Sequence, residues 1–346
     1  MAMKAAVLYK TNEPLKIADF PNPEPKGSEV AVKVEFCGLC HTDVHIWEGY
    51  YGPIKIEERG VRLPLIMGHE IAGSIAAVGD DVRGFKVGDK VLVYPWIGDG
   101  TCKMCISGKE NLCNAVKPLG ILMNGGYAEY VLVPHYRYLV MADGLSLDAA
   151  APLSCAVITA YGAVKKAMVG PDDYVVVLGV GGLGHLAVQL ASHLYRPLVI
   201  AVDVRDEALR LSREVGADFT VNASRQNFAN EVRRITGGAG ADAVIDFVTT
   251  SETSFSAFSA VRRGGRLVLV GLSGDYSKFI LPLVAMRGVT IAGSYVGSLE
   301  DLMELKELLG RGVLRTVTAT MALKKVNEAI SMIREKKAVG RIILKP

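Results

Sequence analysis

A glycine-rich turn between an apolar strand and a helix constrains this chain more than any other feature. Residues 175–178 are continuously apolar, and residues 183–194 have the one-sided apolar pattern of a helix. Glycines between them allow a tight turn, close approach of a pyrophosphate to the backbone, and packing of the helix on the strand. Free N–H groups at a helix start attract phosphate. The pattern predicts a dinucleotide site at Gly179, Gly181, Gly182, Leu183 and Gly184.

An acidic residue ends the next apolar run, at Asp203. Its carboxylate can accept hydrogen bonds from the adenosine ribose hydroxyls and would repel a 2′-phosphate. Arg205 is evidence for NADP instead, because a nearby guanidinium can bind such a phosphate. The sequence therefore favours NAD over NADP. The alternative interpretation is a glycine-rich turn in an α/β domain that binds no nucleotide.

The pattern of the chain changes near residue 156. Before it, short segments with period two are separated by glycine and proline, which is typical of an antiparallel, barrel-like β domain. After it, apolar runs alternate with helical segments, which predicts a parallel sheet covered on both faces. The fold class is thus α/β, with a doubly wound Rossmann domain beside a β-rich domain. Residues 340–344 look like a strand that returns to the first domain.

Three of the six cysteines share one polar loop with an aspartate, in the order Asp99, Cys102, Cys105 and Cys113. Four such ligands can close a tetrahedron around zinc and leave no open position, so the predicted site is structural. The alternative is a reduced cysteine cluster without metal. Cys37 and Cys40 match the C-x-x-C-H pattern of haem attachment and the C-x-x-C redox pattern, but neither has its usual context here. Cys37 is most simply a core thiol.

Composition excludes several classes of protein. Hydrophobic residues make up 50% of the 346 residues and charged residues 22%, with a net charge of +3, which argues against disorder. No run of like charges suggests a nucleic-acid or membrane partner, and the N-terminus lacks the core of a signal peptide. We expect a cytoplasmic location, where thiols stay reduced.

Five segments, in order, make the chain similar to the zinc-containing medium-chain alcohol dehydrogenases over essentially its whole length. They are residues 38–45, 68–73, 99–113, 154–161 and 179–184. Within that family the chain most resembles the tetrameric enzymes of thermophilic prokaryotes. The resemblance implies a GroES-like catalytic domain at 1–156 and 297–346, an NAD-binding domain at 157–296, a small alcohol or carbonyl substrate, and a homotetramer.

The resemblance also implies a second, catalytic zinc. Its ligands would be Cys40, His69 and Cys155, the set of two thiolates and one imidazole, with one open position, that alcohol dehydrogenases use. Glu70 would lie beside the metal and ligate it transiently. Asp43 would orient the ring of His69.

Further roles follow from the same resemblance. Thr42 would hydrogen-bond the alcohol, and the proton would leave through Thr42 and the cofactor ribose to His45. Residues expected to contact the cofactor are His41 and Arg341 at the pyrophosphate, Thr159 at the nicotinamide, and the backbone around Val270, Leu272, Ser294 and Tyr295 at the carboxamide.

Two residues depart from the usual pattern of the family. Asp99 stands where a fourth cysteine is usual, so we expect weaker retention of the structural zinc. His41 stands where the animal enzymes often have arginine, which would speed cofactor release.

Three rival functions remain. A polyol or threonine dehydrogenase tends to carry glutamate at the position of Cys155, and a zinc-free quinone reductase would lack the catalytic ligands. A non-catalytic nucleotide-binding protein would have no use for a proton path through Thr42 and His45.

Overall fold

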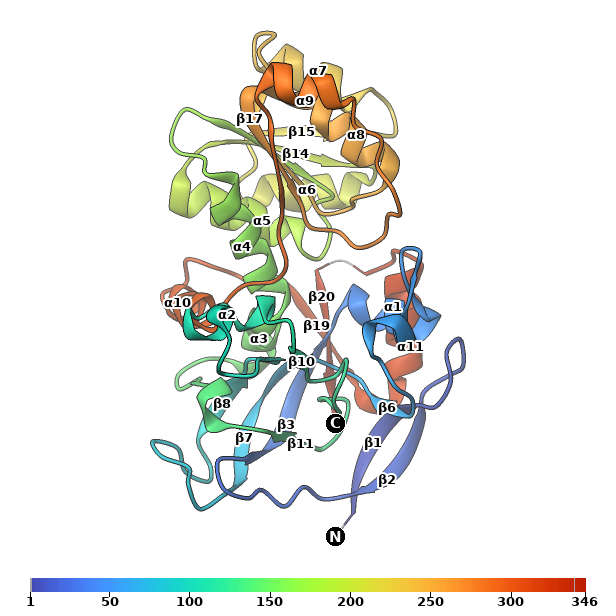
Figure 1. Ribbon diagram of the computed structural model, residues 1–346, viewed down its shortest axis with the longest axis vertical. Helices are drawn as coiled ribbons and strands as arrows, with labels where there is room; N and C mark the ends of the chain where they lie inside the picture. The colour runs from blue at the N-terminus through green and yellow to red at the C-terminus, as the bar shows by residue number, and fades with distance from the viewer. Residues whose placement is uncertain (1, 339) are drawn as a thin grey trace. The chain divides into compact units, whose positions relative to one another are not determined.

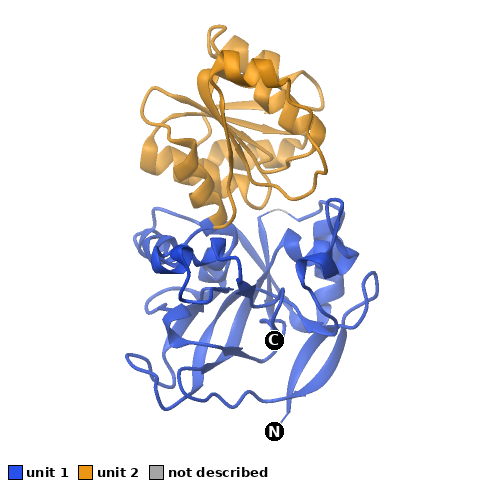
Figure 2. Ribbon diagram, in the orientation of Figure 1, with its two compact units in different colours: residues 1–158, 297–346 blue, residues 159–296 orange. Residues whose placement is uncertain are grey.

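The computed structural model describes residues 2–338 and 340–346 (Figure 1). The chain forms two compact units (Figure 2): Met1–Ile158 with Gly297–Pro346, and Thr159–Val296. The chain therefore leaves the first unit once and returns to it. The assignment of one function to each domain, with bounds at residues 156 and 297, stays a prediction.

The first unit is built on a seven-stranded sheet with the order β12-β8-β7-β3-β20-β19, and β11 pairs with β3 beside this path. The strands are β3 (Val30–Leu39), β7 (Glu70–Val78), β8 (Lys90–Val93), β11 (Tyr130–Val133), β12 (Leu139–Met141), β19 (Thr318–Ala322) and β20 (Arg341–Lys345). Neighbours are antiparallel except for the parallel pair β19 and β20. Since β20 pairs with β3, the predicted return of the C-terminal strand is confirmed.

A three-stranded sheet of the first unit contains the N-terminus. Its order is β2-β1-β6, with β1 (Ala2–Leu8), β2 (Lys16–Pro21) and β6 (Leu65–Ile66). Strand β1 was not predicted from the sequence pattern. The reason is visible in its burial, because residues 5–8 are all buried and lack the alternation of a half-buried strand.

The second unit has a six-stranded, all-parallel sheet, which confirms the predicted doubly wound fold. Its order is β15-β14-β13-β16-β17-β18, with β13 (Tyr174–Leu178), β14 (Leu198–Asp203), β15 (Phe219–Asn222), β16 (Ala241–Asp246), β17 (Val261–Leu269) and β18 (Thr290–Gly293). The central strands are buried because helices cover the sheet (Figure 1). Most of α4 (Ala156–Ala167) belongs to this unit, followed by α5 (Gly184–Leu190), α6 (Asp206–Glu214), α7 (Phe228–Ile235), α8 (Ser251–Ala260) and α9 (Leu281–Arg287).

The strand order of this sheet reverses beside β13. From β13 the chain adds β14 and β15 on one side, and then β16, β17 and β18 on the other. In an open α/β sheet, ligands bind outside the carboxyl ends of the strands at such a switch point. A ligand of this sheet is therefore expected at the turns that follow β13 and β16.

Helices differ slightly from the sequence prediction. The helix expected over residues 183–194 ends at Leu190, and a π-helical turn, Ala191–Tyr195, follows it and ends at Arg196 in the left-handed conformation. The remaining helices are α1 (His41–Glu48), α2 (Lys103–Ile106), α3 (Leu147–Ala150), α10 (Leu299–Gly310) and α11 (Val326–Arg334). Within the described residues, no single helix is long and apolar enough to span a membrane. One bent pair of helical segments, 147–154 and 156–167, reaches that length and apolar character only when the two are counted together.

Candidate metal centres and nucleotide-binding edge

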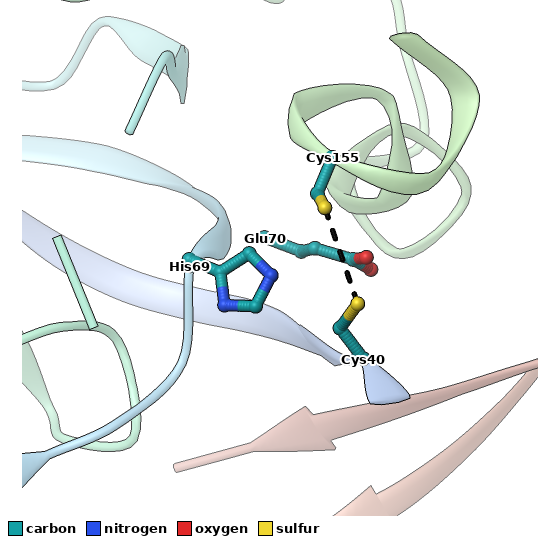
Figure 3. A group of neighbouring side chains, drawn as sticks. All are labelled: Cys40, His69, Glu70 and Cys155. Carbon is teal, nitrogen blue, oxygen red and sulfur yellow. Dashed lines mark hydrogen bonds between the residues drawn. The ribbon is translucent and has the colours of Figure 1, made fainter. Parts of the chain in front are cut away.

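Four potential metal ligands lie together inside the first unit, in what we call the buried cluster (Figure 3). Cys40 precedes α1, His69 and Glu70 stand at the start of β7, and Cys155 lies between the 3-10 turn Ala151–Ser154 and α4. All four are buried, and their ligand atoms lie within 4.8 Å of one another. The fold thus brings together residues that are far apart in sequence.

The buried cluster fits a zinc ion. The sulfur atoms of Cys40 and Cys155 are 4.0 Å apart. Two thiolates bound at 2.3 Å to a tetrahedral zinc would be about 3.8 Å apart. Among the described residues, neither ring nitrogen of His69 nor Oε2 of Glu70 has a hydrogen-bond partner, although all three atoms are buried. Buried polar atoms without partners are rare. Nδ1 of His69 faces Asp43 at 3.5 Å, and a metal ion bound beside Nε2 of His69 and Oε2 of Glu70 would explain the other two atoms.

Glu70 occupies space that a glycine leaves open. Gly38 pairs with Glu70 across β3 and β7, and a Cβ atom at Gly38 would lie 2.0 Å from Oε2 of the glutamate. Arg341, at the start of β20, donates to Oε1 of Glu70 and, at 3.0 Å, to the carbonyl oxygen of Leu39. Burial raises the pKa of Glu70 to about 7, against the opposing effect of Arg341. A carboxyl group with such a pKa can change its charge near neutral pH.

Asp43 links the buried cluster to the surrounding backbone. Its Oδ2 accepts hydrogen bonds from the Cys40 N–H and the Tyr127 hydroxyl, both at 2.9 Å, while Oδ1 lies 3.5 Å from Nδ1 of His69. Burial lowers the pKa of His69, but Asp43 and Cys40 outweigh it and raise that pKa well above its ordinary value. The hydrogen bond with Cys155 is the main reason that the pKa of Cys40 is lowered, and a lowered pKa favours the metal-binding thiolate.

The predicted proton path begins on α1, beside this cluster. Thr42 is half-buried and His41 is exposed, whereas His45 is only 8% exposed. The His45 ring lies 4.9 Å from that of His41 and 5.5 Å from that of Tyr51, measured between centroids. Burial, and then the charge of His41, lower the pKa of His45 to about 4. The imidazole of His45 is therefore neutral at physiological pH.

The second group of ligands, which we call the loop cluster, comprises Asp99, Cys102, Cys105 and Cys113. Its ligand atoms also lie within 4.8 Å of one another, but burial is graded, from exposed Asp99 through Cys102 to buried Cys105 and Cys113. Oδ1 of Asp99 accepts the N–H groups of Thr101 at 2.8 Å and Cys102 at 2.9 Å, and these two bonds lower the pKa of Asp99. Asp99 thus carries a negative charge at physiological pH, as a metal ligand requires.

The loop is attached to the body of the first unit at two points. Arg137 donates to Oε1 of buried Glu110 at 2.9 Å, and the Tyr138 hydroxyl donates to the Gly98 carbonyl at 3.3 Å. Gly98 is also needed for space, because a Cβ atom there would lie 2.4 Å from the sulfur of Cys105. The loop cluster therefore has a rigid base at Cys105 and an open side at Asp99.

The glycine turn of the second unit has the geometry that a pyrophosphate requires. Gly179 has a φ of +85°, and a Cβ atom at Gly184 would lie 2.2 Å from the Gly179 carbonyl oxygen. At Gly181, by contrast, the nearest atom to an added Cβ is the flexible Nη2 of Arg205, at 3.5 Å. Packing within the protein explains the first and third glycines but not the second. Close approach of a phosphate is the remaining reason for a glycine at that position.

Asp203 ends β14 and is nearly buried. Its Oδ1 accepts the backbone N–H of Arg205 at 3.0 Å, and the Nε of the Arg205 side chain lies 3.6 Å from the same oxygen. The carboxylate is thus held in place, and the charge of Arg205 is partly balanced by it.

Four other predicted cofactor residues follow β17 and β18 at the carboxyl edge of the sheet. Val270 and Ser294 are buried, Tyr295 is half-buried, and Leu272 is 44% exposed. Ser294 donates its N–H to the Leu269 carbonyl at 2.8 Å, which joins the ends of the two strands. Thr159 is buried in α4. The four positions after β17 and β18 share the carboxyl edge of the sheet with the glycine turn after β13, and the contacts of all five residues with a cofactor stay predictions.

Several residues that support the sites were not predicted, because they have little signal in the local sequence. Tyr127 is fully buried and binds Asp43, Gly38 makes room for Glu70, and Arg137 anchors the metal loop. Each acts through a partner distant in sequence, so no local pattern marks it. The glycine between Cys37 and Cys40 was the one available signal, because a glycine inside a strand often marks a close approach of another group.

Family models match both parts of the chain. Residues 26–143 match the alcohol dehydrogenase GroES-like domain, and residues 182–311 match the zinc-binding dehydrogenase model.

Full-length relatives agree with these matches. The chain is 46% identical to an NAD-dependent alcohol dehydrogenase of Sulfurisphaera tokodaii and 43% identical to one of Saccharolobus solfataricus, with 99% of this chain and all of each relative covered. Its fold is similar to the crystal structure of the alcohol dehydrogenase from Aeropyrum pernix, with a TM-score of 0.94 and 36% identity over 99% of this chain and 100% of that one.

Proposed function

The chain belongs to the zinc-containing medium-chain alcohol dehydrogenases, and from this premise we propose that it oxidises primary and secondary alcohols reversibly to aldehydes and ketones with NAD. The observation that carries the proposal is the buried cluster, with two sulfurs 4.0 Å apart beside a buried imidazole whose Nε2 has no hydrogen-bond partner among the described residues. When bound, zinc supplies a Lewis acid that makes a hydroxyl group more acidic, and NAD supplies a hydride acceptor.

Two groups of residues are proposed to hold the two zinc ions. Cys40, His69 and Cys155 hold the catalytic metal and leave one position open for the alcohol, while Glu70, paired with Arg341, ligates it only transiently. Asp43 fixes the ring of His69 by facing its Nδ1 at 3.5 Å, and Tyr127 in turn holds Asp43. The second zinc is held by the loop cluster, where all four ligand positions are taken by the protein, so its role is structural.

Thr42 and His45 handle the proton. The Thr42 hydroxyl can accept a hydrogen bond from the alcohol and donate one onward. The neutral ring of His45 can accept a proton and release it to solvent, with its pKa of about 4 ensuring that the ring does not retain it. His41 and Arg341 are proposed to lie against the cofactor pyrophosphate, and Thr159 to lie near the nicotinamide.

In the second unit the glycine turn binds the pyrophosphate and Asp203 binds the adenosine ribose. The backbone around Val270, Leu272, Ser294 and Tyr295 is proposed to hold the carboxamide. This assignment is supported by their common position at the carboxyl edge of the parallel sheet, next to the switch point.

One experiment tests the proposal directly. Purified protein is assayed with NAD and with NADP against a primary, a secondary and a benzylic alcohol, a polyol and threonine, by the absorbance of the reduced nicotinamide. We expect turnover of the simple alcohols with NAD. Preference for the polyol or threonine would favour the rival dehydrogenases, and NADH binding without turnover of any substrate would favour a nucleotide-binding protein.

We also infer a homotetramer. The support comes from an apolar surface near β18, the edge strand of the second unit. The helix α9 has no buried residue, and Leu281 and Met286 are 75% and 67% exposed. Exposed apolar patches of this kind commonly mark protein interfaces. Light scattering coupled to size-exclusion chromatography measures the mass, and a monomer at micromolar concentration would contradict the inference.

A cytoplasmic location is part of the same proposal. All six cysteines are free, and both metal clusters need reduced thiols to bind zinc. Cell fractionation of the source organism is the test.

A further inference from the structure

A buried carboxylate lies at the switch point of the parallel sheet, at the start of a turn to which no cofactor role has been assigned so far. Asp246 is the last residue of β16 and is fully buried. Its Oδ1 accepts the backbone N–H groups of Val248 at 2.9 Å and Thr249 at 2.8 Å, and its Oδ2 accepts the hydroxyl of Thr253 at 3.0 Å. A carboxylate is stable in such a place only with bonds like these.

These bonds hold the turn after β16 in an unfavourable conformation. Thr249 has a φ of +53°, which is rare for a β-branched residue. The backbone N–H of Thr249 donates to the Asp246 carboxylate, as described above. The Thr249 hydroxyl donates to the Asp246 carbonyl oxygen at 2.9 Å and accepts the N–H of Gly271 at 2.9 Å. Gly271 lies just after β17, so Asp246 connects the ends of two neighbouring strands through one threonine.

The same turn packs against the glycine turn of the predicted nucleotide site. A Cβ atom at Gly179 would lie 2.6 Å from Cγ2 of Val248, and one at Gly271 would lie 2.4 Å from the Val248 carbonyl oxygen. The N–H of Phe247 also donates to the Leu178 carbonyl at 2.9 Å. The position of Val248 therefore limits where the backbone of Gly179 can lie.

We propose that Asp246 is a positioning residue for dinucleotide binding: it holds Val248 and Thr249 so that they support the turn that begins at Gly179. Asp246 itself does not touch the cofactor in this proposal. The inference rests on the proposed binding of NAD and adds a determinant of its affinity.

The experiment measures the Kd for NADH by nicotinamide fluorescence in zinc-loaded protein, with zinc content and Tm recorded for every variant. Asp246→Ala is expected to raise the Kd about ten- to hundredfold, because the N–H groups of Val248 and Thr249 lose a charged acceptor and the loss of such a bond corresponds to a change of about that size. Zinc content should not change. Asp246→Asn should restore the Kd to within about threefold, because its amide can accept the two N–H bonds and donate to the Thr253 hydroxyl.

Asp242 provides a matched control on the same strand. It lies at the opposite end of β16, where it accepts the backbone N–H of Tyr174 at 2.8 Å and pairs with Arg262. Asp242→Ala should lower the Tm but leave the Kd for NADH unchanged. A wild-type Kd in Asp246→Ala, or an equal rise in Asp242→Ala, would overturn the positioning role.

A second variant keeps the test decisive if Asp246→Ala does not fold. Thr249→Val preserves the shape of the side chain and removes the hydroxyl that joins Asp246 to Gly271. We expect a smaller rise of the Kd, and an unchanged Kd would overturn the proposal. If the wild-type protein binds no NADH, the proposed function itself is wrong, which is a separate outcome.

Discussion

The two metal clusters of the first unit use similar ligands in opposite ways. The buried cluster takes Cys40, His69 with Glu70, and Cys155 from three distant segments, and all of its members are buried. The loop cluster takes all four ligands from residues 99–113, and its burial falls from Cys113 to the exposed Asp99. One is assembled by the fold, whereas the other lies within a single loop.

The surroundings of the two clusters explain what each can do. The buried cluster includes a carboxyl with a pKa of about 7, a buried guanidinium and an aspartate that faces the imidazole. Charged and titratable groups therefore surround the metal ligands on several sides. The loop cluster instead has backbone N–H groups bonded to Asp99 and two side-chain anchors, the pair Arg137 and Glu110 and the Tyr138 hydroxyl on the Gly98 carbonyl. Its surroundings stabilise one conformation of a loop.

The largest expected effect is loss of the catalytic zinc. Cys40→Ser or His69→Ala should reduce kcat/KM at least about a thousandfold, because Lewis-acid catalysis contributes several kcal/mol and each 1.4 kcal/mol is tenfold. The zinc content measured by elemental analysis should fall from two ions per chain to one. If either variant kept two zinc ions and most of its activity, the distinction between the clusters would be wrong.

The second prediction separates the metal clusters from the cofactor site. Asp203→Ala should lower the NAD to NADP ratio of kcat/KM about ten- to hundredfold, since charge-assisted hydrogen bonds contribute about 1.5–3 kcal/mol. Arg205, which lies 3.6 Å from the carboxylate, would then be released to meet a 2′-phosphate. Both zinc ions should remain. An unchanged cofactor ratio would show that Asp203 does not face the ribose.

The contrast between the clusters also shows what the sequence could predict. The loop cluster and the glycine turn are local in sequence, so the spacing of their residues was enough to identify them. The parallel sheet was likewise predicted, because its strands are buried on both faces and read as continuous apolar runs.

The buried cluster could not be identified from spacing. Cys40, His69 and Cys155 were assigned only from the resemblance to a family, because the antiparallel pairing of β3 and β7 brings the first two segments together. Burial also sets a property of His45 that the sequence does not show. The ordinary pKa of histidine is about 6.5, and burial, followed by the charge of His41, lowers the pKa of His45 to about 4.

The third prediction concerns this shift. His45→Gln should slow alcohol oxidation less than about tenfold near neutral pH, below the 10²-fold or more of a strong general base, because a group with so low a pKa is a weak base. The defect should shrink as pH rises, since hydroxide then takes the proton. Zinc content and NADH affinity should be unchanged, and added imidazole should restore part of the rate. Loss of zinc would make His45 part of the metal site instead.

The same shift predicts how stability depends on pH. The pKa of His45 is lower in the folded chain than in the unfolded chain, so between about pH 4 and 6.5 the unfolded state binds more protons. The wild type should therefore lose stability as pH falls through this range, and His45→Gln should lose less. Parallel stability curves for the two proteins, from denaturant unfolding at several pH values, would contradict the lowered pKa.

The smallest effect on turnover is expected at Asp99. Asp99→Asn keeps an oxygen that can accept the N–H groups of Thr101 and Cys102 but removes the charge that binds the metal, whereas Asp99→Cys supplies a fourth thiolate. We expect the Asn variant to raise the Kd of the loop zinc at least about tenfold, since losing even outer partners of a metal ligand has effects of 10–100-fold. The Cys variant should hold this zinc more tightly than the wild type.

Turnover at moderate temperature should change less than about twofold in both Asp99 variants, because the loop cluster has no open position for a substrate. Zinc release to a chromophoric chelator should show two phases in the wild type, and only the faster phase should respond to residue 99. The Tm should fall in the Asn variant as the loop zinc is lost. A change in the slow phase, or a loss of kcat that parallels the loss of zinc, would mean that the two clusters are coupled and that the exposed ligand also serves catalysis.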